Sequence, residues 1–439
     1  MMTSPMKVCT VAFLVLGTAA CDLDLQDPNI PTEEQVISAP TTLAQVVLGL
    51  QAEYAGQLAD PITTTAMVTN ELGAGAATFE SYRVIDTGSD AATNDFGFST
   101  GTWSGQYRVI RIADIVIGNA GNVGFGPGTV SGILATGQLF KAMALGNLIQ
   151  IYEQIPLDVS PINRTPQFAT RAAALEEIIR LLQQAEAQLV QTPQSAEFTT
   201  QMVAPGFDLM NTIRAMLARY SLIAGNLTAA DAAAASVNGT VFSEYRFSTT
   251  DANPVWNLAV NGGNSTSMRP KDVWRLEAES GDERVEYWVE EAAIQGFAAP
   301  LDDFNRYSDR SHSIPAYLPD EMTLIRAEVA ARENRLFPDA LGYVNAVRTQ
   351  CSSSLPEPVA CLPALTALDV PTQAAMLAEI LNQRRYELYL QHLRWSDLRR
   401  FGQAVKYEWM PVSILECDRN PNTPAALCTA KPANPAVVN

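Results

Sequence analysis

Most of the chain repeats apolar residues at the spacing of an α-helix. In the segment 103–120, Trp103, Tyr107, Ile110 and Ile117 fall on one stripe, as they do when the backbone turns once every 3.6 residues. Similar patterns, with polar starts and Gly, Asn or Pro at their ends, predict further helices. We expect helices over 31–60, 103–120, 131–157, 170–190, 207–239, 319–349 and 372–401. The pattern therefore predicts a mostly α fold with few short strands.

Two regions interrupt the helical pattern. Residues 70–102 and 241–318 are rich in Gly, Ser, Asn and Asp, with aromatic residues set among them. Such composition favours turns and loops over regular packing. We therefore expect a long loop over 70–102. The main part of the chain then divides into N-terminal helices and loop (31–240), a loop-rich insertion (241–318) and C-terminal helices with a tail (319–439).

Two of the predicted helices fold back as helix pairs with related sequences. The first pair carries Arg214-Ala215 and turns at Asn226, and the second carries Arg326-Ala327 and turns at Asn334. Small residues that follow each Arg-Ala let neighbouring helices pack closely, a feature of tetratricopeptide-like repeats. The spacing between matching points differs, so the units do not form a regular tandem array.

The N-terminus has the layout of an export signal. A basic Lys7 precedes an apolar run that is too short to cross a bilayer, and small residues follow it up to Cys21. We interpret residues 1–20 as a signal peptide and Thr18-Ala19-Ala20-Cys21 as a lipobox, in which Cys21 carries a lipid anchor. Ordinary cleavage after Ala19 or Ala20, which would leave Cys21 as a free thiol, is the alternative. The mature domain would then be 21–439.

The four later cysteines form two local couples. An even number of cysteines in an exported chain favours disulfides. Of the three possible pairings we favour Cys351 with Cys361 and Cys417 with Cys428. A zinc site is the competing interpretation, disfavoured because the chain has no Cys-x-x-Cys and only two histidines.

Composition argues against several functions. The net charge of −18 disfavours binding to nucleic acid through a basic surface. Nucleophile-elbow, phosphate-loop, zinc-protease and dinucleotide motifs are all absent from the sequence, and two histidines offer little general-base capacity. We expect no enzyme activity, no cofactor and no metal, although a pair of carboxylates of the glycosidase type is not excluded by sequence.

Aromatic residues in the polar loops suggest ligand binding. Indole, phenol and phenyl rings stack on the apolar face of a sugar while Asn, Asp and Arg bond its hydroxyl groups. Residues with core stripes to join, such as Trp103 and Tyr107, are better explained by packing. The candidate ligand-binding residues are Arg83, Asn94, Phe96, Phe98, Trp256 and Tyr307.

A run of arginines near the C-terminus invites a phosphate-binding interpretation. Acidic residues lie among them, and Arg384 and Glu387 have the i, i+3 spacing of a pair on one helix. We therefore interpret these charges as solvated helix faces or intrahelical pairs.

Several segments together resemble the SusD/RagB-like family of surface lipoproteins that capture nutrients. Within 321–348 the similarity lies in a Glu-x-x-Leu-x-Arg-Ala-Glu segment closed by Asn-x-Val-Arg. Within 384–400 it lies in Arg-Arg-x-Glu-Leu followed by Arg-Trp-x-Asp-Leu-Arg-Arg, with His392-Leu393 where the family pattern has a glycine. The tail adds Pro411, Glu416, Asn420 and Pro421.

The resemblance implies a tetratricopeptide-like helical scaffold decorated by loops. It also implies a non-catalytic lipoprotein in the outer membrane, exposed at the cell surface. There it would bind an oligosaccharide or peptide and deliver it to a SusC-like TonB-dependent transporter. The family motifs are structural, so no ligand residue follows from them. The alternative function is a helical-repeat scaffold that docks other proteins at the membrane.

Overall fold

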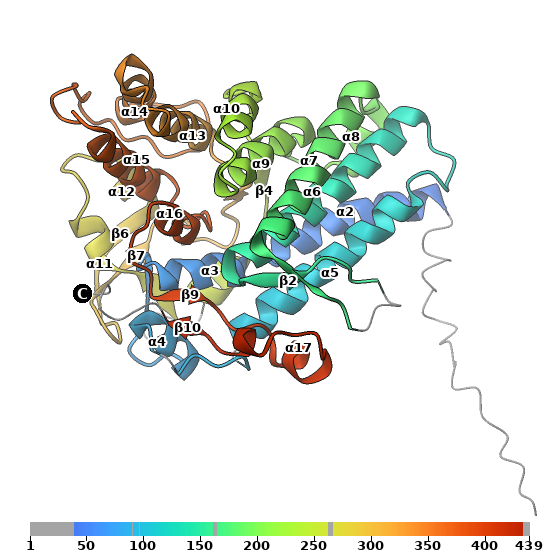
Figure 1. Ribbon diagram of the computed structural model, residues 1–439, viewed down its shortest axis with the longest axis horizontal. Helices are drawn as coiled ribbons and strands as arrows, with labels where there is room; N and C mark the ends of the chain where they lie inside the picture. Colours follow the sequence, from blue (N-terminus) through green and yellow to red (C-terminus); the bar gives the residue numbers. More distant parts are fainter. Residues whose placement is uncertain (1–38, 90, 96, 161–164, 262–266, 433–439) are drawn as a thin grey trace, which may run out of the picture.

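The computed structural model describes residues 39–89, 91–95, 97–160, 165–261 and 267–432. Helices make up most of this part of the chain, as Figure 1 shows. The predicted mostly α fold with few short strands is therefore confirmed. No helix within these ranges is long and apolar enough to cross a membrane. The predicted signal peptide and Cys21 lie outside the described residues.

The N-terminal half begins with helices that pack side by side. Its elements are α2 (Pro40–Gly56), α3 (Ala59–Val68), α4 (Glu80–Thr87), α5 (Gly97–Asn119) and α6 (Pro127–Ile151). The first described helix starts with Pro40 in its first turn, while Ala39 in the cap position makes no side-chain bond. Thr41 and Thr42 lie inside this helix and do not cap it.

Small residues make α6 the central helix of this half. Nearly every residue from its second turn onward is buried, with helices on several sides. A Cβ atom added to Gly146 would lie 1.9 Å from the Tyr220 hydroxyl oxygen, and one added to Gly132 would lie 2.5 Å from the Phe198 ring. Glycine at these two positions therefore lets α8 (Ala196–Met202) and α9 (Leu209–Ile223) approach the α6 backbone.

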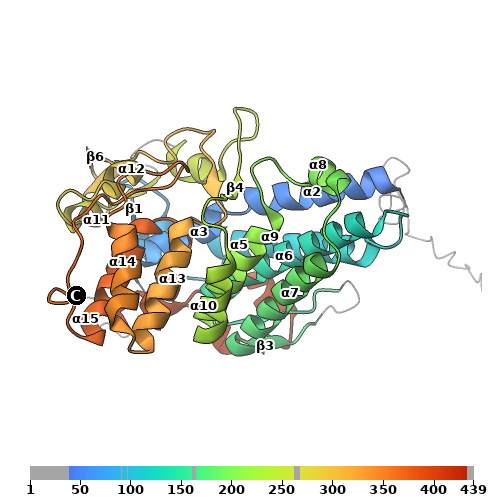
Figure 2. The same ribbon diagram turned by 90° about the horizontal axis from the view of Figure 1, so that it is seen from above.

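The later helices continue a row of antiparallel neighbours. Figure 2 shows α6, α7, α9, α10 and α13 following one another across the molecule, and both α14 and α15 pack against α13. The bounds are α7 (Arg171–Gln191), α8 (Ala196–Met202), α9 (Leu209–Ile223), α10 (Leu227–Ser236), α13 (Pro319–Arg332), α14 (Leu341–Arg348) and α15 (Gln373–Glu387). The two predicted helix pairs are α9–α10 and α13–α14, which meet where α10 packs on α13.

Polar caps fix where many of these helices begin. The side chains of Thr170, Asp208, Asn226 and Thr372 each accept a hydrogen bond from the backbone N–H three residues on, at the starts of α7, α9, α10 and α15. Such bonds satisfy an amide that the helix itself leaves free. The segment boundaries predicted from sequence at 170 and 372 follow from these caps.

Strands are short and occur in antiparallel pairs. Within the described ranges the pairs are β1 (Leu72–Ala74) with β5 (Met268–Pro270), β2 (Gln154–Pro156) with β3 (Phe168–Thr170), β4 (Glu244–Tyr245) with β8 (Ile314–Pro315), β6 (Val289–Ile294) with β7 (Leu301–Phe304), and β9 (Tyr407–Trp409) with β10 (Lys431–Pro432). Short helical segments complete the chain: η1 (Trp256–Val260), α11 (Asp272–Leu276), α12 (Arg284–Trp288), η2 (Leu336–Ala340), α16 (Arg394–Arg400), α17 (Ile414–Arg419) and η3 (Ala425–Cys428). The β1–β5 pair joins the insertion 241–318 to the N-terminal half, whereas β4–β8 and β6–β7 lie within the insertion.

The prediction of a continuous loop over 70–102 is wrong in part. This region contains β1, α4 and the start of α5. Helix α4 buries Val84 and Ile85, and its Asp86 carboxylate accepts a hydrogen bond from the Ala74 amide and pairs with Lys271. Pairing with β5 and burial against α3 therefore order a segment whose composition by itself favours a loop.

The predicted single helix over 372–401 is also wrong. It is divided into α15 and α16, and the intervening residues Leu390 and His392 have φ angles of +56° and +61°. Left-handed residues of this kind end a right-handed helix. His392 stands where the resembled pattern has glycine, the residue that adopts this conformation most easily.

Buried contacts hold His392 in this conformation. Its Nδ1 atom lies 2.8 Å from the Pro61 carbonyl oxygen and 3.1 Å from the Thr65 hydroxyl. Burial lowers the pKa of His392 to about 4. The imidazole is therefore neutral at physiological pH and joins α3 to the bend between α15 and α16.

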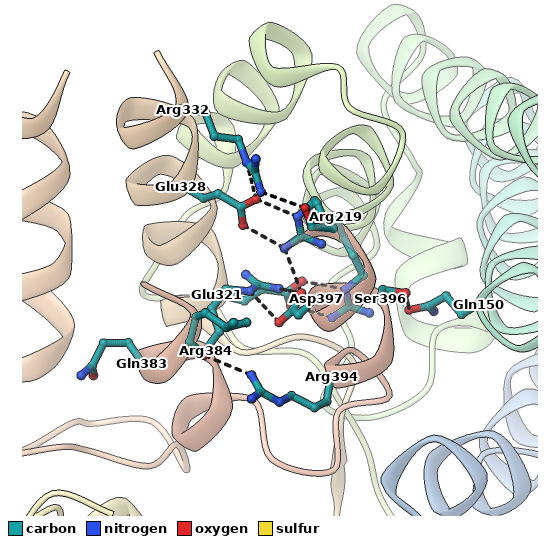
Figure 3. A network of polar contacts seen from close by, with 12 residues as sticks. Gln150, Arg219, Glu321, Glu328, Arg332, Gln383, Arg384, Arg394, Ser396 and Asp397 are labelled. Carbon is teal, nitrogen blue, oxygen red and sulfur yellow. Dashed lines mark hydrogen bonds and ion pairs between the residues drawn. The ribbon is translucent and has the colours of Figure 1, made fainter. Parts of the chain in front are cut away.

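Arginines near the C-terminus form a buried network instead of a solvated face (Figure 3). The Asp397 carboxylate accepts two hydrogen bonds from Arg384, at 2.8 and 2.9 Å, and one from Arg400, at 2.9 Å. Arg400 also donates two bonds, at 2.7 and 2.8 Å, to Glu328, which Arg332 contacts as well. The expectation of solvated helix faces is thus wrong for this cluster, which we call the carboxylate–arginine network. Intrahelical pairs are present in part, because Arg400 pairs with Asp397 and Arg332 with Glu328 on the same helices.

Both expected disulfides are present. Cys351 is bonded to Cys361 and Cys417 to Cys428. The first closes the loop that follows α14, and the second joins α17 to η3 in the tail. The favoured pairing is confirmed, and both bridges stabilise segments with little regular structure.

Removal of the negative charge of Asp397 should lower the free energy of unfolding of the protein. In Asp397→Asn, Arg384 would lose its carboxylate partner while it stays buried, and removing one partner of a buried pair costs about 3–5 kcal/mol. We expect the free energy of unfolding in urea to fall by about 3 kcal/mol. The control is Glu177→Gln, which breaks a partly exposed pair with Arg180 and should change it by less than about 1 kcal/mol. Equally small changes in the free energy of unfolding for both variants would contradict a large contribution of the network to stability.

His392 should make stability depend on acidic pH. Its folded pKa is depressed to about 4 from an ordinary value near 6.5. The unfolded chain therefore takes up the proton first, and its contribution to stability is lost as pH falls from 6.5 towards 4. His392→Asn, which tolerates the left-handed backbone, should reduce the loss between pH 6.5 and 4.5 by about 2 kcal/mol. Parallel pH–stability curves for the two proteins, measured by urea unfolding, would contradict this.

Candidate ligand-binding site

Two loops that are far apart in sequence are joined at one edge of the molecule. The segment after β1 and the turn between β6 and β7 share backbone hydrogen bonds from the Phe297 amide to the Ala74 carbonyl, 2.8 Å, and from the Ala76 amide to the Gln295 carbonyl, 3.3 Å. These bonds fix the start of α4 against the tip of the β6–β7 hairpin. The side chains at this junction come from both loops.

The junction carries aromatic side chains that face solvent. Phe79 is 74% exposed and Phe297 is 47% exposed. The Tyr82 ring lies 6.4 Å from the Phe79 ring, and the Arg83 guanidinium lies 5.2 Å from the centre of Phe297. We call these four residues the aromatic platform. Exposed phenyl rings are unfavourable in water, so exposed rings at one junction make it a candidate binding surface.

Polar groups accompany the rings of the platform. The buried Nε atom of Arg83 has no hydrogen-bond partner among the described residues. Burial and the nearby charge of Asp60 raise the pKa of Tyr82, so its phenol stays protonated and able to donate. The platform thus offers flat apolar faces together with N–H and O–H donors, which is the combination that sugar rings require.

Trp256 lies on η1, at the surface of the insertion. Its ring is half-buried, its Nε1 atom donates to the Ser308 carbonyl at 3.1 Å, and the Arg310 guanidinium lies 4.9 Å from the ring centre. The neighbouring Asn257 is exposed. These contacts fix the indole against the loop that follows β7 and leave part of it accessible.

The structure places the other candidate residues differently. Arg83 belongs to the platform, whereas Asn94 is half-buried beside the tail, where its carbonyl accepts the Ile414 amide at 3.0 Å. Phe98 lies in the first turn of α5, but its side chain is outside the described set, as is all of Phe96. The proposed ligand contacts of these residues stay predictions.

Tyr307 is a core residue. Its side chain is fully buried, and its ring lies 6.3 Å from the buried Trp288 ring. Its backbone has a φ of +69°, and its amide donates to Nδ1 of His312. A side chain without exposed surface has no access to a ligand, so the prediction of ligand contact is wrong for this residue.

Sequence reasoning missed three platform residues: Phe79, Tyr82 and Phe297. A signal was present, because Phe79 and Tyr82 lie in a polar stretch without a hydrophobic stripe to join. Nothing local to Phe297 links it to them, since the contact arises from the pairing of distant loops. No group of three or more His, Cys, Asp or Glu side chains arranged for a metal ion occurs in the described ranges.

Comparison with protein families finds the SusD family, whose model matches residues 307–429. This segment covers the turn into α13, the helices α13 to α17 and the carboxylate–arginine network. Proteins of this family are non-catalytic binding proteins. A comparison with curated proteins gives no match.

Solved structures resemble the whole fold. A SusD superfamily protein from Bacteroides thetaiotaomicron has 16% identity and a TM-score of 0.67, with 88% of this chain and 97% of that chain covered. A SusD-like carbohydrate-binding protein from Bacteroides vulgatus has 16% identity and a TM-score of 0.65, covering 82% and 83%. A laminarin-binding SusD-like protein has 15% identity and a TM-score of 0.65, covering 86% and 97%. At these identities the likeness establishes the fold, and the tetratricopeptide-like scaffold that was expected is confirmed.

Proposed function

We propose that this chain, whose residues 307–429 match the SusD family model, binds an oligosaccharide at the aromatic platform and delivers it to a TonB-dependent outer-membrane transporter. The observation that carries the proposal is the pair of exposed phenyl rings, Phe79 and Phe297, set beside Tyr82 and Arg83. The protein itself leaves the saccharide uncleaved and acts as a binding subunit.

The chemistry of the platform supports a saccharide ligand. The C–H faces of a sugar ring pack on phenyl rings, while Arg and Tyr donors bond the ring's hydroxyl groups. Two fold relatives carry names that state carbohydrate or laminarin binding. The platform comes from loops held by backbone bonds to the scaffold, so it is formed before a ligand arrives and little ordering is needed on binding.

The location of the protein follows from the N-terminal segment. A lipid on Cys21 would hold the chain at the outer membrane, with residues 22–38 linking the anchor to α2. A saccharide captured at the surface then needs a channel to enter the cell. A SusC-like transporter next to the lipoprotein would supply that channel, and this partnership is part of the proposal.

Loss of the platform rings should abolish binding. The probes are soluble laminarin, starch, xylan, xyloglucan and levan, tested with purified protein by affinity electrophoresis and calorimetry. We expect at least one polysaccharide to bind, and Phe79→Ala with Phe297→Ala to weaken it by tenfold or more, since a few central aromatic side chains dominate most binding surfaces. The matched control is Leu368→Ala, which removes an 89% exposed apolar side chain elsewhere.

The results separate three cases. Binding by the wild type that the double variant retains would exclude the platform as the site. Lack of binding to every polysaccharide would contradict the saccharide proposal. Shortening of the bound chains during incubation would contradict the non-catalytic assignment.

Membrane attachment should depend on Cys21. Full-length wild-type protein should fractionate with the outer membrane and co-purify in detergent with a large β-barrel protein. Cys21→Ser, which lacks the acylated thiol, should lose membrane attachment and incorporate no labelled fatty acid. Equal membrane retention and labelling of both proteins would contradict the lipid-anchor proposal, and wild type that purifies without a barrel protein would contradict the transporter partnership.

A further inference from the structure

A small cavity opens beside Trp256, between the α2–α3 turn and η1. Its volume is about 250 Å³, and its wall includes Gly56, Gln57, Asp60, Pro254 and Asn257. Typical small-molecule pockets measure about 300–1,000 Å³, so this one is large enough for a single sugar ring and too small for an oligosaccharide.

Asp60 is the ionisable group of this cavity. It lies in the first turn of α3 and is partly buried, and no hydrogen bond or ion pair to its carboxylate is recorded in the described part of the chain. Burial raises the pKa of Asp60 to about 6, with no charged neighbour to offset it. An acceptor that is left without donors in a partly dry site is unfavourable unless a ligand supplies them.

Helix α5 is shaped to admit this carboxylate. A Cβ atom added to Gly101 would lie 2.1 Å from Oδ2 of Asp60, and one added to Gly105 would lie 2.2 Å from Oε1 of Gln57. Both glycines lie on the face of α5 that meets the α2–α3 turn. Because Gly101 has no side chain, the Asp60 carboxylate can lie against the α5 backbone. Gly105 makes the same room for the Gln57 side chain.

A structural role for Asp60 explains only part of this arrangement. An acidic residue in the first turn of a helix interacts favourably with the helix dipole. That interaction needs no cavity and is available to a fully solvated carboxylate. Partial burial opposes it by raising the pKa, so the helix dipole does not account for the position of the carboxylate.

The cavity lies next to the aromatic platform. Burial raises the pKa of Tyr82 and the charge of Asp60 adds to this shift, as expected for side chains in the same region. Helix α3 packs against both α4, which carries Tyr82, and α5, which carries Gly101. A saccharide that covers Phe79 and Tyr82 therefore has its next unit within reach of the cavity.

We propose that Asp60 forms a second subsite, in which its carboxylate accepts hydrogen bonds from the hydroxyl groups of one uncharged sugar unit. The proposal rests on the function proposed above and extends it to specificity. Two carboxylate oxygens match two adjacent hydroxyl groups, and bonds to a charged acceptor are about twice as strong as neutral ones. Units that lack one of these hydroxyls, or that carry an acidic group there, bind less well.

Binding to the subsite should strengthen as pH rises. Hydroxyl donors stabilise the charged form of Asp60, so affinity falls as pH decreases through the pKa of the free protein, about 6. Glu71 and Lys406, whose burial shifts their pKa values to about 7, lie at the opposite end of α3 from Asp60. Three other groups in this region have pKa values shifted out of the range between pH 5 and 7.5. Burial raises the pKa of Tyr82 and Tyr152, and it lowers that of His392, behind α3, to about 4. Glu53 and Arg108 form an ion pair with each other, and the Arg310 guanidinium lies over the Trp256 ring.

The test compares Asp60→Asn with wild type on the polysaccharide that the wild type binds best among laminarin, starch, xylan, xyloglucan and levan. We expect affinity at pH 7.5 to fall about tenfold in the variant. Wild-type affinity should fall several-fold from pH 7.5 to 5, whereas the variant should show little dependence on pH. Gly101→Ala, which displaces the carboxylate, should weaken binding similarly. The matched control is Asp272→Asn, in the first turn of α11, which should leave affinity unchanged.

Stability provides a second readout. Since the raised pKa makes the charged Asp60 unfavourable in the folded protein above pH 6, Asp60→Asn should melt at the same or a higher temperature than wild type at pH 7.5. Weaker binding without loss of stability is not expected of a residue whose role is only structural.

Each outcome bears on the proposal. Wild-type affinity that is retained by Asp60→Asn and unaffected by pH, but lost with the platform rings, would overturn the subsite and leave the proposed function intact. Wild-type protein that binds none of the five polysaccharides would overturn both.

Discussion

The Asp397 carboxylate lies between the guanidinium groups of Arg384 and Arg400, and Arg400 reaches on to Glu328. Each carboxylate is buried, so its charge is tolerable only while the arginines stay in place. The three helices that supply these groups, α13, α15 and α16, are thereby fixed relative to one another. Proximity to these arginines holds the pKa of both Asp397 and Glu328 below the usual range.

The same helices connect the two halves of the molecule. Glu321, also on α13, accepts two hydrogen bonds from Arg219 of α9, at 2.7 and 2.6 Å. Arg399 of α16 donates to the Gln150 carbonyl near the end of α6, at 2.7 Å. Ionic contacts therefore extend from the C-terminal helices into the row that begins with α6, and the scaffold behaves as one support for the loops on its edge.

Both proposed binding surfaces lie at the edge of this support. The aromatic platform and the Asp60 cavity lie on turns and helix starts that are held by backbone hydrogen bonds. Exposed rings and a partly buried carboxylate without a donor both reduce stability, and the rigid scaffold compensates for that cost. Binding residues on loops can thus differ between relatives of the same fold, which agrees with a family match confined to 307–429.

Periodicity, caps and cysteine spacing were enough to predict the mostly helical fold, the helix pairs and the two disulfides, because these features depend on residues close in sequence. The position of a left-handed residue in the bend at 390–392 was not apparent, since His392 adopts that conformation only with help from Pro61 and Thr65. Resemblance to a known motif located the Arg-Trp segment but did not explain its charges.

Tertiary structure alone decided which charges and rings meet. Helical spacing pointed Arg384 towards Glu387, but the bend before α16 brings Asp397 closer and buries the pair. Arg83 was recognised from its polar surroundings, whereas Phe297 joined it only through the pairing of distant loops, and Tyr307 proved to be core. The sequence by itself determined the elements, because local geometry depends on neighbouring residues. The candidate site depended on contacts between segments that are distant in the sequence. Such contacts form only when the helices and strands have packed together.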